Sequence, residues 1–144
     1  LQRDTERLSE MVYRAIKVKA DIVERDERES GDRRLLNLGH TLAHAIEKSS
    51  TKMNHGEVVA VGLALIAEVA TSRDMLAVAD KERIVALLER AGFMLDAPVE
   101  IRTLLKAVAK DKKTEGSDIH IVFPLGVGRC TVEKMPVEEF KSLF

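Results

Sequence analysis

The feature that most restricts the fold of this chain is a run from Val58 to Ala67 that contains no charged residue. The run is too short to span a bilayer, which requires about 20 apolar residues in a helix. A helix that is apolar on all sides is normally buried inside a protein. We therefore expect a central helix over roughly residues 55 to 73, enclosed by other elements.

Apolar residues at three- and four-residue steps predict a second long helix near the N-terminus, over roughly residues 3 to 27. Its apolar side would consist of Leu8, Met11, Val12, Ala15, Val18 and Ile22. A polar run follows, in which Gly31 ends this helix. Asp32 is a plausible N-cap for a further helix over residues 33 to 48.

Two more helices are expected in the second half of the chain. Asp80 resembles an N-cap, and Gly92 marks the end of the helix that it would start. Pro98 precedes another helix, over roughly residues 100 to 110.

The chain changes character towards the C-terminus. The segments "DIHIVF" and "RCTVEK" are short and rich in β-formers, with "PLGVG" between them, which predicts a hairpin. A short helix should follow Pro136. The expected fold is mainly α: residues 1 to 144 form a single domain, a helical bundle with a small β-hairpin near the C-terminus.

Composition excludes several functional classes. The 144 residues are 45% hydrophobic and 33% charged with a net charge of −1, so no global field favours nucleic acid or a membrane surface as a partner. Cys130 is the only cysteine, which rules out an intrachain disulfide and a thiolate zinc site. The absence of a signal-like segment and this cysteine usage suit a cytoplasmic protein.

Histidines are concentrated in one part of the chain. On a helix over residues 33 to 48, five polar side chains would share one face: Arg33, Asn37, His40, His44 and Glu47. Two histidines four residues apart can bind one metal ion. This face could equally recognise an anion or a polar substrate, and such a pair is also common on ordinary surfaces.

His55 strengthens the metal hypothesis, because a short loop can return it towards His40. Glu47 and Glu57 are candidate carboxylate ligands, but zinc usually takes three or four protein ligands, so we expect one from outside this chain. There is no HExxH motif of a zinc protease. His120 is expected to be structural. Lys19, Lys112 and Lys113 are ordinary solvated lysines unless the fold brings them near the histidines.

Taken in order, "KADIVERDERESGDRRLLNLGHTLAHAIE", "HGEVVAVGL" and "KDKKTEG" resemble the C-terminal domain of the 3-dehydroquinate synthase family. The resemblance implies an enzyme that converts the phosphorylated keto acid DAHP to 3-dehydroquinate and phosphate, in the shikimate pathway. It implies NAD and a divalent metal, Zn²⁺ or Co²⁺, as cofactors.

The resemblance also implies roles for individual residues. His40 and His55 match metal ligands, and His44 matches an active-site histidine near the substrate. Arg33 and Asn37 match substrate-binding positions. Lys19 matches a substrate lysine. Lys112 is favoured over Lys113 as the lysine of the "DKK" motif that contacts substrate.

The family's NAD-binding domain and its third metal ligand, a glutamate, belong to an N-terminal half that has no counterpart in this chain. We therefore expect one domain of a two-domain enzyme, inactive alone, with its own N-terminal domain as partner and a homodimer as the complete protein. Two alternatives remain open. One is a related sugar phosphate cyclase with a different substrate, and the other is a non-catalytic helical interaction module.

Overall fold

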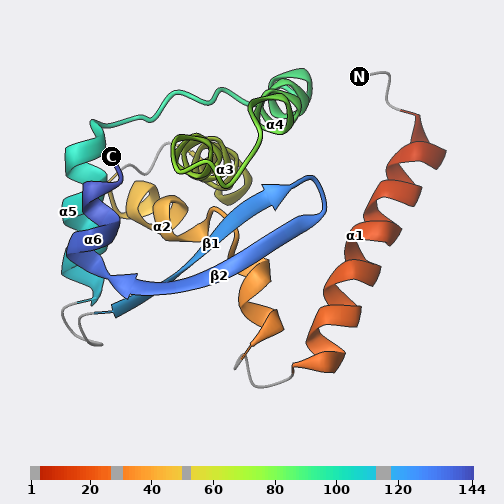
Figure 1. Cartoon of the computed structure of the whole chain (residues 1–144). Coiled ribbons are helices and arrows are strands. Elements are labelled where there is room, and N and C mark those ends of the chain that lie inside the picture. The colour runs from red at the N-terminus through yellow and green to blue at the C-terminus, as the bar shows by residue number, and fades with distance from the viewer. Residues whose placement is uncertain (1–3, 27–30, 50–52, 113–117) are drawn as a thin grey trace.

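The computed structural model describes residues 4–26, 31–49, 53–112 and 118–144. The mainly α fold with a C-terminal hairpin is confirmed (Figure 1). The elements are α1 (Thr5–Arg25), η1 (a 3-10 helix, Asp32–Asn37), α2 (His40–Ser49), α3 (His55–Ser72), α4 (Val78–Arg90), α5 (Ile101–Lys112), β1 (Asp118–Gly126), β2 (Arg129–Pro136) and α6 (Val137–Ser142).

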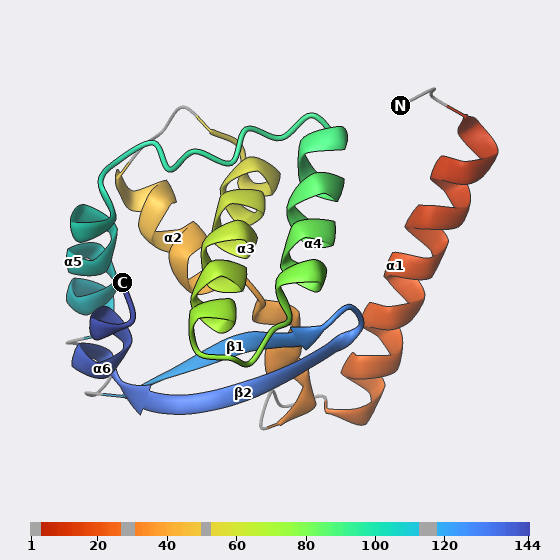
Figure 2. The same ribbon diagram turned by 45° about the horizontal axis from the view of Figure 1, so that its top comes forward.

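The expected central helix is α3. It lies between α2 and α4, with the hairpin crossing one end of the three helices (Figure 2). Val58 and Val61 are fully buried, and the core continues through Leu42 and Ile46 of α2 and Phe123 of β1. By length and composition α3 could cross a membrane. Its packing against α2, α4 and β1 instead accounts for its apolar character.

The expected continuous helix over residues 33 to 48 is wrong. The chain forms η1, turns at Leu38, and passes through Gly39 with φ +78° before α2 begins at His40. The cause is a close crossing with α3, because a Cβ on Gly62 would lie 2.2 Å from the Gly39 carbonyl oxygen. Only glycine at both positions allows this contact, and the pattern of apolar residues does not register it.

Two predicted caps are also wrong. Gly31, not Asp32, precedes η1, and Ala77, not Asp80, precedes α4. Asp80 lies in the first turn of α4, where its carboxylate binds Arg83 at 3.0 Å. By contrast, Asn54 caps α3 with a reciprocal pair of hydrogen bonds to Glu57.

The hairpin is longer than predicted, because Pro124 and Leu125 continue β1 rather than forming the turn. Ile119, Ile121 and Phe123 are buried, whereas His120 between them is exposed. β1 therefore supplies one wall of the core, and the placement of His120 in this strand agrees with its expected position in the hairpin.

The N-terminal helix α1 is formed as predicted, but its apolar side is not buried. Met11 and Val12 are 61% and 53% exposed, and Ile22 is the only buried side chain of the helix. In both views α1 stands apart from α2 and α3 (Figures 1 and 2). Among the described elements, η1 makes the main contact with it, where Asp26 Oδ2 accepts from Gly31 N and Arg33 N.

Candidate functional site

The structure brings His40, His44 and His55 together at the start of α2 and α3. Their ring centroids are 5.5 Å apart for His40 and His55, 5.9 Å for His40 and His44, and 6.4 Å for His44 and His55. His40 and His44 share one face of α2 because they lie four residues apart. The capped start of α3 returns His55 to the same place.

A single carboxylate links two of these rings. Glu47 lies one turn after His44 on α2, and its Oε2 accepts from His44 Nδ1 at 3.0 Å. Its Oε1 accepts from His55 Nδ1 at 2.8 Å. The hydrogen bond from His55 and, to a smaller extent, that from His44 hold the pKa of Glu47 below its usual value. The carboxylate therefore stays ionised and acts as an acceptor only.

The hydrogen bonds define the proton positions on the three rings. An ionised carboxylate and a backbone carbonyl only accept, so the bonds to Glu47, and that of His40 Nδ1 to the Leu38 carbonyl at 3.1 Å, place a proton on each Nδ1. In the neutral imidazole, Nε2 then carries a free lone pair. Each ring therefore offers Nε2 as a metal ligand or a proton acceptor.

The donor set fits part of a metal site. Two imidazoles on one tetrahedral zinc, with bonds of about 2 Å, have ring centroids about 5 Å apart. The pair His40 and His55, at 5.5 Å, is nearer to this value than either pair with His44. Within the described ranges, no group of three or more His, Cys, Asp or Glu side chains is placed to hold a metal ion.

The two candidate carboxylate ligands have other partners. Glu57 Oε2 accepts from the Asn54 backbone N–H at 2.8 Å in the capping box, and both oxygens of Glu47 accept from histidines. The side chains of His44 and His55 are 54% and 59% exposed, so the cluster faces the surface. Space for a further ligand exists on that open side.

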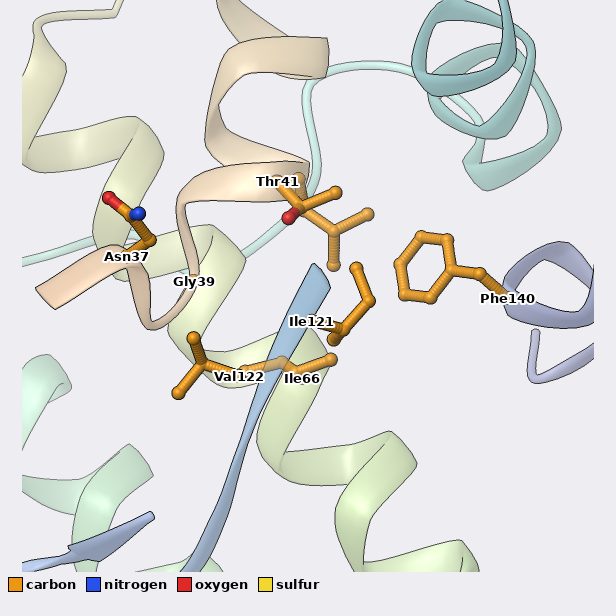
Figure 3. Close-up of a pocket in the computed structure, with 8 residues that line it drawn as sticks. Asn37, Gly39, Thr41, Ile66, Ile121, Val122 and Phe140 are labelled. Carbon is orange, nitrogen blue, oxygen red and sulfur yellow. The ribbon is translucent and has the colours of Figure 1, made fainter. Parts of the chain in front are cut away.

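The predicted substrate residues do not share the histidine face of α2. Arg33 and Asn37 belong to η1, before the break at Gly39. Asn37 and Thr41 contribute the polar side chains at a small pocket between η1, α2, α3, β1 and α6, whose other walls are mainly apolar (Figure 3). Sequence reasoning missed this pocket, because it depends on Ile121 and Phe140 from the end of the chain.

Two of the three predicted lysines, Lys19 and Lys112, belong to described helices. Lys19 is exposed on α1, whose main contact among the described elements is with η1. Lys112 is the last residue of α5. Lys113 falls outside the described residues. The structure therefore groups the three histidines and leaves the lysine assignments as predictions.

Sequence reasoning placed Glu47 on the histidine face and treated it as a candidate metal ligand. Its contact with two Nδ1 atoms was missed. The spacing carried part of the signal, since a residue three positions after His44 lies beside it on a helix. The contact with His55 depends on the packing of α3 against α2.

Solved structures share this fold. A 2-deoxy-scyllo-inosose synthase complexed with carbaglucose-6-phosphate, NAD⁺ and Co²⁺ matches with a TM-score of 0.80 and 21% identity over 96% of this chain. ValA, a 2-epi-5-epi-valiolone synthase from Streptomyces hygroscopicus subsp. jinggangensis 5008 with NAD⁺ and Zn²⁺ bound, matches with a TM-score of 0.80 and 21% identity over 98% of it. The chain spans 40% of the length of each.

A family model provides the more specific comparison. The model described as 3-dehydroquinate synthase C-terminal matches residues 1–114, which include all three clustered histidines and Glu47. The matched range ends before the hairpin, which the solved structures cover. The chain belongs to the 3-dehydroquinate synthase C-terminal family.

Proposed function

We propose that this chain is the metal- and substrate-binding domain of a 3-dehydroquinate synthase, which converts DAHP to 3-dehydroquinate and phosphate. The observation that carries the proposal is the cluster of three histidines, each with its Nδ1 bonded to an acceptor oxygen, in a chain of this family. The complete enzyme would act in the shikimate pathway, in the cytoplasm.

His40 and His55 would bind the metal through Nε2. Their separation and the hydrogen bonds on both Nδ1 atoms suit two ligands of one zinc or cobalt ion. The relatives with Co²⁺ or Zn²⁺ and NAD⁺ bound support these cofactors. When bound, the metal supplies Lewis-acid polarisation of a substrate hydroxyl, and NAD supplies transient oxidation of it.

His44 would face the substrate rather than the metal. Its Nδ1–H is held by Glu47, so its Nε2 can accept a proton from a bound substrate. Arg33 suits an anionic group of DAHP because the guanidinium fork binds two oxygens at once. Asn37, Lys19, Lys112 and Lys113 are proposed to complete the substrate contacts when the complete enzyme closes.

The remaining parts of the site would come from elsewhere in the complete protein. An N-terminal domain would bind NAD and add a third metal ligand, so the isolated domain should have no turnover. The short span of this chain relative to its solved relatives supports this division. A homodimer of the complete enzyme is part of the same proposal.

The test is a variant of His40 in the complete enzyme. We expect His40→Ala to abolish phosphate release from DAHP and to lower zinc content measured by atomic absorption. His120→Ala is the matched control, because His120 is exposed on β1 and lies outside the cluster. Normal turnover and normal zinc content in His40→Ala would contradict the proposal.

A second candidate function is another sugar phosphate cyclase reaction. Its support is the fold shared with 2-deoxy-scyllo-inosose synthase and with ValA. The family model, described as 3-dehydroquinate synthase C-terminal, favours DAHP. Parallel assays of the complete enzyme with DAHP and with a heptulose phosphate separate the two reactions, because each predicts turnover of one substrate only.

A further inference from the structure

Glu47 connects two histidines to which the proposed function gives different tasks. Its Oε1 accepts from His55, a proposed metal ligand, and its Oε2 accepts from His44, the proposed proton acceptor. The contacts are 2.8 and 3.0 Å, within the range of N–H···O hydrogen bonds. One carboxylate thus contacts rings on two helices, α2 and α3.

We propose that Glu47 is a positioning residue that fixes the tautomer and ring orientation of both His44 and His55. Each ring is held with its proton on Nδ1 and its lone pair on Nε2. The use of these lone pairs by metal and substrate rests on the proposed function, whereas the control of the tautomers does not.

The surroundings of Glu47 favour this role over a structural one. Its side chain is 34% exposed and is not part of the hydrophobic core. In water, neutral histidine can place its proton on either nitrogen, and the hydrogen bond made by one nitrogen decides which is free. A mobile surface imidazole without a partner would lose this preference.

His40 provides an internal comparison. Its Nδ1 bonds to the Leu38 carbonyl, which the backbone turn before α2 holds in place. Its tautomer therefore depends on the main chain and not on Glu47. The three rings present the same nitrogen, but two are held by one side chain and the third by the backbone.

Glu47 could instead bind a metal directly. That arrangement would require at least one oxygen to release a histidine N–H, because both oxygens are engaged. The geometry therefore places Glu47 behind the rings, as the hydrogen-bond acceptor that commonly supports a metal-binding histidine.

The experiment compares the chain with its Glu47→Ala and Glu47→Gln variants by ¹⁵N NMR of the histidine rings without metal, at a pH where the imidazoles are neutral. In Glu47→Ala we expect His44 and His55 to lose the Nδ1–H signature and His40 to keep it. In Glu47→Gln the single amide oxygen can hold one ring only, so one of the two should change.

Zinc titration by calorimetry on the same proteins gives the second measurement. We expect Glu47→Ala to weaken zinc binding by about 10- to 100-fold, the usual effect of losing such a partner. Glu68→Ala is the control, because Glu68 is an exposed carboxylate on α3 that contacts Lys81 and no histidine. Circular dichroism checks that each variant is folded.

The outcomes separate this inference from the proposed function. Unchanged tautomers of His44 and His55 in a folded Glu47→Ala variant would overturn the positioning role. Loss of the Nδ1–H bonds in the unmodified chain when zinc is added, with Glu47 on the metal, would also overturn it. Changed tautomers with unchanged zinc affinity would support the positioning role and count against His55 as a metal ligand.

Discussion

Helices α1 and α3 are the two longest among the described residues, with 21 and 18 residues, and their surroundings differ. Both begin at a side-chain cap, Asp4 for α1 and Asn54 for α3. α3 has Val58 and Val61 fully buried, whereas α1 leaves Met11 61% exposed. α1 has the clear apolar stripe, yet most of that stripe is exposed to solvent.

The difference lies in what each helix contacts. α3 packs against α2, α4 and β1, and eight of its residues are buried. α1 meets mainly η1, near its C-terminal end, where Ile22 is buried. A spaced apolar pattern therefore predicts a helix and its apolar side, but burial depends on which other elements reach that side.

A substitution at the crossing of α2 and α3 should destabilise the protein more than any other proposed below. Gly62→Ala would place a Cβ 2.2 Å from the Gly39 carbonyl oxygen, and a backbone atom cannot move aside cheaply. We expect a loss of more than about 3 kcal/mol in the free energy of unfolding, at the upper end for an overpacked core. Urea unfolding followed by circular dichroism measures it.

Gly92→Ala serves as the control for that substitution. Gly92 has φ +93° but nothing within 4 Å of its added Cβ, so only backbone strain of about 1 to 2 kcal/mol is expected. A Gly62→Ala protein as stable as Gly92→Ala would mean that the two helices can separate at little cost.

Replacing a leucine by alanine on a helix packed in the core and on α1 gives a direct comparison. Leu42→Ala removes a side chain that is 1% exposed on α2, and we expect a loss of about 3 kcal/mol from transfer and cavity effects. Leu8→Ala on α1, where Leu8 is 45% exposed, should cost far less. Thermal unfolding of both variants tests the difference, and equal losses would show that α1 is packed in solution.

The smallest effect is expected on the open side of α1. Met11→Lys changes a residue that is 61% exposed, and we expect the free energy of unfolding to change by no more than about 0.5 kcal/mol. Chemical unfolding at low protein concentration is the measurement. A loss of several kcal/mol would mean that this side of α1 contacts the rest of the chain.

The parts of the fold that follow local rules were predictable. The three- and four-residue spacing placed α1, the uncharged apolar run placed α3 and Pro98 placed α5, each close to its observed bounds. The β-rich tail placed the hairpin. The break at Gly39 was not predictable, because the apolar spacing continues through it. Its cause is the contact of Gly39 with Gly62 of another helix. The caps at Asp32 and Asp80 failed because the helices begin earlier or take a 3-10 form.

The candidate site also combines features that local spacing predicts with one that it does not. The grouping of His40 and His44 follows from helical spacing, and the return of His55 was expected from the short loop. The bridging role of Glu47 required the relative position of α2 and α3, which no spacing within one helix contains.

By itself the sequence determined the mainly α composition, the buried character of α3 and the presence of a histidine cluster, because these depend on periodicity over a few residues. Only the tertiary structure decided where η1 ends and α2 begins, which side of α1 stays open and which nitrogen of each histidine is hydrogen-bonded. Those features depend on contacts between residues far apart in the chain, and local patterns do not encode such contacts.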